Sequence, residues 1–336
     1  MSLSRYIKLI AASEDHRALD AEDAHDLFAA ILDGGASELE IGAVLTAFAV
    51  RRESVSEMAG FDRAARSRVH ALRSPWPSPR PLVFGTYGGA KTQPNLLPLL
   101  ALMLQRLGVP VLIHGSLEVA AGVACAYVLR ELGILPCTSL AHAQRALEES
   151  RLAFVPAAVL CPALASLLAL RYRLGVPNVA HTLVKLIDPF HGECIRVVGA
   201  QSECELARFE MVLASTGAQA LLLRGPEGEP FADPRRRPRM LHVRDAMTRR
   251  LFEEETMPAR RMANLVEVCD AATTARWIRQ AISGRVPVPQ PLVNQFACCL
   301  YLSGYAEEFN QAKAIAAVEA GVRTSFGMSN ARGLPV

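Results

Sequence analysis

The chain has 336 residues, of which 51% are hydrophobic, so it can bury a large core and is long enough for two domains. Its formal net charge of +3 is too small to indicate a polyanion partner unless the basic residues cluster. The eight cysteines include no C-x-x-C pair and no His spacing typical of zinc, so they predict no metal site. Residues 1–14 contain no secretory signal, and we expect a cytoplasmic protein.

Residues 1–73 are predicted to form a small helical domain. Three helices in it begin with a capping signal, and each carries an apolar face that requires a partner surface. The capping residues are Asp20 for the first helix, Ser37 with Glu40 for the second, and Ser54 with Glu57 for the third. Gly34 and Gly35 end the first helix.

A proline-rich joint at residues 74–81 leads into a second predicted domain, residues 80–330, in which apolar strand-like runs alternate with helices. This alternation predicts a mainly parallel central sheet covered by helices, and therefore an α/β fold. The tail from Thr273 to Gly321 is predicted to be helical apart from a break at residues 287–291. The candidate strands are Leu82–Phe84, Val109–Ile113, Leu152–Val155, Ile195–Gly199 and Ala220–Leu223.

Residues 152–170 are uncharged and as long as a membrane span. Pro156 and Pro162 divide this segment, however, and favour a short strand followed by a helix that begins near Cys161. We therefore expect no contact with a membrane. The helices from about residue 161 to residue 188 are expected to pack on the helical domain.

A glycine-rich loop, Gly85 to Lys91, follows the first predicted strand. Its backbone N–H groups can turn toward an anion and Lys91 adds a positive charge, which is typical of phosphate binding. Magnesium-assisted phosphate chemistry also needs carboxylates, and the loop contains none. The loop by itself leaves an enzyme and a binding protein both open.

Basic residues cluster between residues 235 and 250, where seven arginines and one acid, Asp245, give a local charge of +6. For the first four of these arginines we expect an extended arm that follows a nucleic-acid backbone, and a solvated loop without a ligand is the alternative. If about four to six phosphates of a single strand are neutralised, log K falls with log salt with a slope of about −3 to −4. The first four arginines, which Pro234 and Pro238 exclude from a regular helix, are Arg235, Arg236, Arg237 and Arg239.

Three segments together resemble anthranilate phosphoribosyltransferase and its nucleoside-phosphorylase-type relatives. They are GTYGGAKTQPN at residues 85–95, GVPVLIHG at residues 108–115 and RYRLG at residues 171–175, in matching order and spacing. The resemblance implies a nucleoside phosphorylase/phosphoribosyltransferase-like fold and a homodimer formed through the helical domain. It also places Arg171 at the ligand, although a cation that satisfies helix-end carbonyls is an open alternative.

The chain departs from this family where the chemistry of the enzymes takes place. Tyr87 and Gly89 replace the second glycine and the aspartate of the family's Gly-Thr-Gly-Gly-Asp loop. Asn95 is kept without the two hydroxyl residues that follow it in the enzymes. His114 and Gly115 are also kept, but the lysine that precedes them in the family is absent. Groups that would hold pyrophosphate are therefore missing.

The acidic pair that holds magnesium in the enzymes aligns with Pro230 and Phe231, and the acids close by are Glu227 and Glu229. Without carboxylates to fix the metal, the pyrophosphate of a phosphoribosyl donor loses most of its charge compensation as it leaves. We therefore assign no catalytic residue, no metal ligand and no cofactor.

The chain is more closely similar to the YbiB-type branch of this superfamily, whose members bind nucleic acids without clear sequence preference. The similarity implies binding of single-stranded DNA or RNA by a scaffold that has lost its catalytic metal site. The alternative is an anthranilate phosphoribosyltransferase, or a related glycosyltransferase, that uses phosphoribosyl pyrophosphate and Mg²⁺. The segments that carry the similarity are residues 87–91, 95–101, 180–186, 225–229, 233–235 and 297–300.

Several candidate residues each have two possible roles. Tyr87 either stacks on an unpaired base or packs in the core, and His114 and His181 either donate to a ligand or form structural hydrogen bonds. Lys185 lies in an apolar segment and needs water or an anion at its charged end. The residues expected to contact nucleic acid are Lys91, Arg171, Arg173, Lys185, Arg235, Arg236, Arg237 and Arg239. Those of the vestigial phosphate and substrate pocket are Gly85, Thr86, Tyr87, Gly88, Asn95, His114, Gly115 and Arg171.

Overall fold

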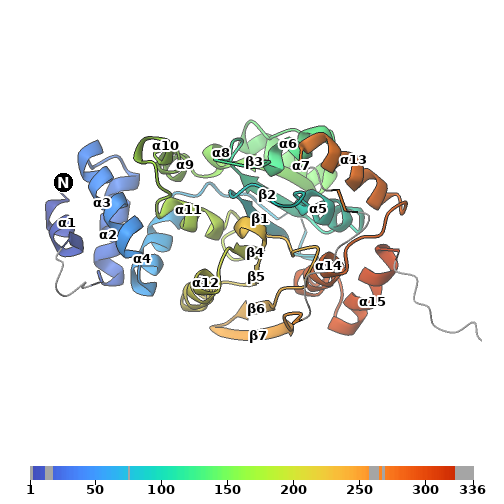
Figure 1. The fold of residues 1–336 in the computed structure, drawn as a ribbon. Helices are drawn as coiled ribbons and strands as arrows, with labels where there is room; N and C mark the ends of the chain where they lie inside the picture. Colours follow the sequence, from blue (N-terminus) through green and yellow to red (C-terminus); the bar gives the residue numbers. More distant parts are fainter. Residues whose placement is uncertain (1–2, 12–17, 75, 257–264, 267–268, 322–336) are drawn as a thin grey trace, which may run out of the picture.

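The computed structural model describes residues 3–11, 18–74, 76–256, 265–266 and 269–321. A helical lobe with the N-terminal helices lies at one end, and an α/β lobe built on a sheet forms the rest (Figure 1). The expected combination of a small helical domain with a larger α/β domain is confirmed.

The N-terminal helices begin where their capping residues predict. The Asp20 carboxylate accepts hydrogen bonds from the N–H groups of Glu22 and Asp23. Both capping boxes form, the first at Ser37 and the second at Ser54. The four helices are α1 (Ser4–Ala11), α2 (Ala21–Leu32), α3 (Glu38–Arg51) and α4 (Val55–Arg66).

A later segment of the chain packs against these helices. Leu164 and Leu183 share one buried cluster with Phe28 and Phe61, and α10 and α11 lie beside α3 and α4 in Figure 1. The helices of this segment are α8 (Ala157–Leu160), α9 (Pro162–Ala169), α10 (Arg171–Leu174), α11 (Ala180–Leu183) and the 3₁₀ turn η1 (Val184–Leu186).

Residues 152–170, which imitate a membrane span in sequence, form a strand and two short helices, as the prolines predict. In the part of the chain that the structure describes, no helix combines the length and the apolar character needed to cross a bilayer.

The central sheet has seven strands in the order β3-β2-β1-β4-β5-β6-β7. The first five are parallel to one another, while β6 and β7 run antiparallel at one edge. All five predicted strands are confirmed to within two residues at each end. The strands are β1 (Leu82–Thr86), β2 (Val111–Gly115), β3 (Leu152–Pro156), β4 (Ile195–Ala200), β5 (Ala220–Arg224), β6 (Met240–Arg244) and β7 (Met247–Phe252).

Alternating strand residues fill the cores on the two faces of the sheet. Phe84 and Ile113 face a cluster that includes α5, α6, α13 and α14, whereas Val83 and Leu112 face α7. On that second face α12 covers β4 and β5. The helices are α5 (Leu97–Arg106), α6 (Cys125–Glu131), α7 (Leu140–Ser150), α12 (Glu203–Ser215), α13 (Ala271–Ile282), α14 (Gln290–Ser303) and α15 (Phe309–Glu319).

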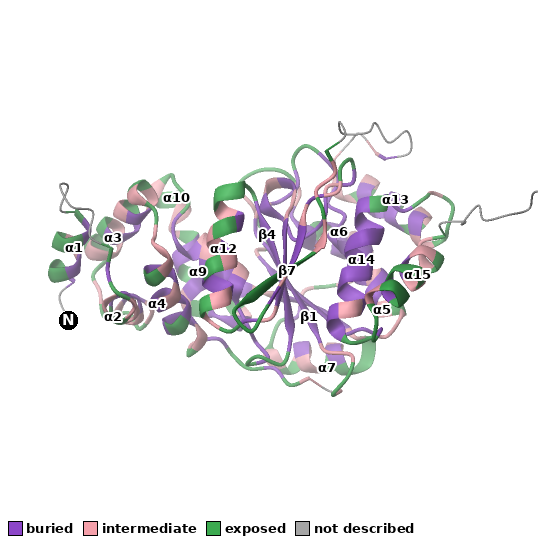
Figure 2. Ribbon diagram, turned by 90° about the horizontal axis from the view of Figure 1, so that it is seen from below, coloured by how far each residue is buried: buried purple, intermediate pink, exposed green. Residues whose placement is uncertain are grey.

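The antiparallel hairpin of β6 and β7 was not predicted. Its turn residues Asp245 and Ala246 both have positive φ, 51° and 60°, which a hairpin turn usually achieves with glycine. Three arginines of the basic cluster at residues 235–250 therefore lie in the strands of this hairpin, and β7 is the exposed edge of the sheet (Figure 2). They are Arg244, Arg249 and Arg250.

Candidate functional site

The candidate site lies at the carboxyl ends of the parallel strands, where ligands bind in open α/β sheets. Here β1 runs into the glycine-rich loop, and β5 runs into the turn η2 (Pro226–Gly228). The two segments are in direct contact. A Cβ added at Gly88 would lie 2.4 Å from the carbonyl oxygen of Glu227, so only glycine permits this approach.

A carboxylate from the chain itself occupies the glycine-rich loop. Glu229 Oε1 accepts hydrogen bonds from the backbone N–H groups of Tyr87 at 3.0 Å, Gly88 at 2.7 Å and Gly89 at 3.2 Å. Its other oxygen accepts from the Thr86 hydroxyl. The N–H groups expected to bind a phosphate are thus already satisfied by an internal anion.

Glu229 is fully buried. Burial raises the pKa of its carboxyl, although the hydrogen bonds from Thr86, Gly88 and Gly89 and the charge of Lys185 act in the opposite direction. The second nearby acid, Glu227, accepts hydrogen bonds from the backbone and the hydroxyl of Thr92. Both acids are therefore engaged in holding the loop.

Tyr87 and His114 form a buried pair behind the loop. Tyr87 Oη lies 2.7 Å from His114 Nδ1, and burial lowers the pKa of His114 to about 3, so its ring is neutral at pH 7. Tyr87 is 7% exposed and belongs to the cluster that fills the helical lobe. This arrangement favours core packing over base stacking for Tyr87. For His114 it favours a structural hydrogen bond over donation to a ligand.

The structure brings most of the vestigial pocket together. Gly85, Thr86 and Gly115 lie at the paired ends of β1 and β2, and Gly88 lies in the loop that follows β1. Asn95 is buried and uses its side-chain oxygen to accept from the N–H of Leu97 at 3.3 Å, at the start of α5. The buried Nδ2 of Asn95 has no hydrogen-bond partner among the described residues.

A cleft of about 550 Å³ separates the helical lobe from the loop. Five cations and three acids line it. Two of the cations are neutralised, since Lys185 pairs with Glu205 at 3.2 Å and Arg208 pairs with Glu53 at 3.3 Å. The cations with no ion-pair partner among the described residues are Arg52, Lys91 and Arg171.

Sequence reasoning identified Lys91 and Arg171 but missed Arg52 and Arg208. Arg52 follows α3 with a φ of 64°, so the chain turns there and directs this residue away from the helix. No spacing in the sequence signals that turn. His181 also lines the cleft; burial, with a smaller effect of Arg171, lowers the pKa of His181 to about 4.

The arginine arm differs from its prediction. As expected it is not helical, but its side chains are largely occupied. Arg236 pairs with Glu254 at 3.5 Å, Arg237 donates to the carbonyl of Glu253 and Arg239 pairs with Glu203 at 2.8 Å. The prediction of freely presented guanidinium groups is wrong for these three, because Glu254 and Glu203 pair with Arg236 and Arg239, and a backbone carbonyl accepts from Arg237.

Arg235 and Arg173 were also expected to contact nucleic acid, and the structure shows their surroundings. Arg235 is exposed, and no partner contacts its guanidinium group in the described part of the chain. Arg173 pairs with Glu38 of α3 at 3.0 Å and does not line the cleft. Of the residues expected to contact nucleic acid, Lys91, Arg171 and Lys185 therefore line the cleft, whereas Arg173 and the four arginines of the arm do not.

Comparisons with known proteins agree with this geometry. Residues 7–69 match the family described as "Glycosyl transferase family, helical bundle domain". The chain is 37% identical over 308 residues to "Uncharacterized protein YbiB" of Escherichia coli, covering 91% of this chain and 96% of that protein. It is 27% identical to anthranilate phosphoribosyltransferase of Geobacillus kaustophilus, covering 92% of each.

This chain belongs to the anthranilate phosphoribosyltransferase-like superfamily of glycosyltransferases. Anthranilate phosphoribosyltransferase from Thermus thermophilus superposes with a TM-score of 0.75 at 26% identity, over 93% of both chains. The enzyme from Saccharomyces cerevisiae, solved in complex with PRPP and Mg, shares the fold with a TM-score of 0.74 at 17% identity, over 95% of this chain and 93% of that one.

The residues of this superfamily member do not fit a phosphoribosyl pyrophosphate and magnesium site. Glu229 occupies the N–H groups that would receive the phosphate. Glu227, the other acid near the loop, accepts from Thr92 through Oε1, and its buried Oε2 has no hydrogen-bond partner among the described residues. Among residues that the structure places, no three His, Cys, Asp or Glu side chains converge as metal ligands would.

Proposed function

We propose that this protein binds single-stranded DNA or RNA through the phosphate backbone, without sequence preference, in the cleft between its two lobes. The observation that carries the proposal is the Glu229 carboxylate inside the glycine-rich loop. It excludes the donor phosphates from the place where a transferase would need them, while the cationic groups of the cleft stay available. Binding without phosphoribosyl transfer is the activity most consistent with that arrangement.

The charges of the cleft support a phosphodiester ligand. Arg52, Lys91 and Arg171 line one cavity and lack ion-pair partners among the residues described. Contacts of this kind to phosphates carry no sequence information, so they fit a strand of any sequence. Three such groups along one cleft can meet successive phosphates of a polymer.

A binding titration tests this proposal. We expect a fluorescein-labelled oligothymidylate to bind at low salt, and the double variant Lys91→Ala/Arg171→Ala to bind about tenfold or more weakly. Arg145→Ala is the matched control, because Arg145 is an exposed cation on α7 outside the cleft. Absence of binding by the unaltered protein at low salt would refute the proposal.

Phosphoribosyl transfer to anthranilate is a second candidate, favoured by the names of the relatives and by their similarity along nearly the whole chain. In that case Asn95, His114 and Arg171 would position substrates. The test is incubation with phosphoribosyl pyrophosphate, Mg²⁺ and anthranilate. Product formation that Arg171→Ala abolishes would establish the enzyme, and its absence in a protein that binds oligonucleotides would exclude it.

Pairing of two copies through the helical lobe stays a prediction. Leu39 and Val50 of α3 expose large apolar side chains, 84% and 83% accessible, on this lobe. Such groups favour contact with another protein surface.

A further inference from the structure

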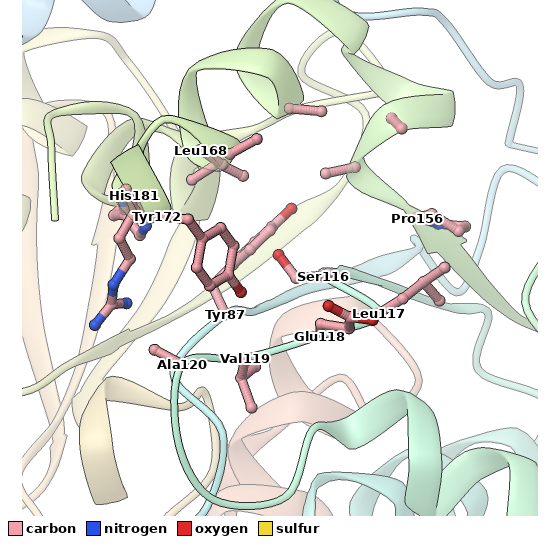
Figure 3. A pocket seen from close by; sticks show the side chains of 16 residues that line it. Tyr87, Ser116, Leu117, Glu118, Val119, Ala120, Pro156, Leu168, Tyr172 and His181 are labelled. Carbon is pink, nitrogen blue, oxygen red and sulfur yellow. The ribbon is translucent and has the colours of Figure 1, made fainter. Parts of the chain in front are cut away.

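A second cavity, of about 350 Å³, lies beside the cationic cleft. The two share Tyr87, Arg171 and His181 as lining residues, so the cavity adjoins the cleft at these residues. Figure 3 shows Tyr172 projecting from above into the same space, with Ser116 and Leu117 on the opposite wall.

The lining of this cavity is mostly apolar. Leu168, Pro156 and Val119 contribute three sides of it, and Tyr172 contributes an aromatic ring that is 66% exposed. A flat, weakly polar group fits such a lining, because aromatic rings pack against one another through their faces. Arg171 stands at the boundary with the cleft and offers a cation to whatever anion is attached to that flat group.

An unpaired nucleobase with its own phosphate has this combination of properties. We propose that the cavity beside Tyr172 is a nucleobase subsite, in which one base stacks on the Tyr172 ring while the adjoining phosphate meets Arg171. The inference rests on the proposed nucleic-acid binding and adds to it the part of the nucleotide that enters the protein. It also gives a physical reason for preferring single strands, since a paired base in a duplex does not offer its face.

The aromatic residue named from the sequence was Tyr87, and the structure assigns the stacking role to a different ring. Tyr87 is 7% exposed and its hydroxyl is paired with His114. Tyr172 has no such restraint within the described residues and faces the cavity from α10. A ring that is already exposed can receive a base without rearrangement of the core.

The test compares a normal oligothymidylate with an abasic chain of equal length, which has the same phosphates and no bases. For the unaltered protein we expect the normal chain to bind about tenfold or more tightly than the abasic chain. Tyr172→Ala should bring this ratio close to one while binding of the abasic chain is unchanged. Tyr172→Phe should keep the ratio, because the ring is retained.

Tyr305→Ala is the control, since Tyr305 is a partly exposed tyrosine that lines neither cavity. Equal binding of both chains by the unaltered protein would overturn the base subsite and leave backbone binding standing. A ratio unaffected by Tyr172→Ala would likewise overturn it. Failure of both chains to bind would overturn the subsite together with the proposed function.

Discussion

Glu229 shows how one side chain can convert an anion site into a closed structure. Its carboxylate supplies the negative charge that the N–H groups of Tyr87, Gly88 and Gly89 favour. Removal of the carboxylate should therefore restore a site for an external anion. Gly88 lines the cleft, so this site would be within reach of solvent.

We expect Glu229→Ala to lower the free energy of unfolding by about 3 kcal/mol, because buried donors lose their acceptor. Inorganic pyrophosphate should recover part of this loss by binding to the folded variant. Thermal unfolding with and without pyrophosphate measures both effects. The midpoint of the unaltered protein should not respond.

Glu227→Ala is the matched control, since Glu227 lies two residues away and bonds only Thr92 among the described residues. It should gain no response to pyrophosphate. The interpretation of Glu229 as an internal ligand would be wrong if both variants responded equally, or if a folded Glu229→Ala protein gave no shift.

The role of Glu229 could not be predicted from the sequence, although the family resemblance placed it close to the positions of the magnesium-binding acids. Its hydrogen bonds join residues about 140 positions apart, and their existence depends on how β5 leads into η2. Local patterns contain no information about that approach. The ion pairs of Arg236 with Glu254 and of Arg239 with Glu203 were likewise not predictable, because they also depend on how separate segments meet in the fold.

At the scale of secondary structure, local signals were sufficient where an element depends on its own residues. The capping boxes located α3 and α4, and apolar runs located the five parallel strands, which are buried on both faces. The hairpin of β6 and β7 was not predicted, because its turn has no glycine and its second strand is polar and exposed.

The two capping boxes differ in what surrounds them, which leads to a prediction about stability. Glu57 is fully buried and also accepts from Arg51 Nη2 at 2.6 Å and from the N–H of Leu19 at 2.8 Å. Glu57→Gln leaves the Arg51 cation without its partner and should lower the free energy of unfolding by about 3 kcal/mol. Urea unfolding measures this loss.

Glu40→Gln provides the comparison, because Glu40 occupies the corresponding position of the α3 box, accepts from the N–H of Leu3 as Glu57 does from that of Leu19, and is not buried. Its cost should be about 1 kcal/mol or less. Similar losses for the two variants would mean that the buried ion pair adds nothing beyond the cap, contrary to this account.

Over the whole molecule, the distribution of charge matters more than its total. The chain has 36 lysines and arginines and 33 acids, and many of the arginines form ion pairs with those acids. The cluster of +6 at residues 235–250 loses much of its field to Glu203, Glu253 and Glu254. Under the proposed function, the strand meets the three cations of the cleft that have no ion-pair partner among the described residues.

This distribution predicts that log K falls less steeply with log salt than the slope of about −3 to −4 expected from the sequence. Three phosphate contacts on a single strand give a slope of log K against log salt of about −2, because each contributes about −0.7. Lys91→Ala/Arg171→Ala should reduce the slope to about −0.7. Anisotropy titrations at several salt concentrations measure both values. A slope of about −3 or steeper would contradict this account if Arg236→Ala/Arg237→Ala, and not the cleft variant, made it shallower. The strand would then bind at the arm, after phosphate had displaced the internal partners of these arginines.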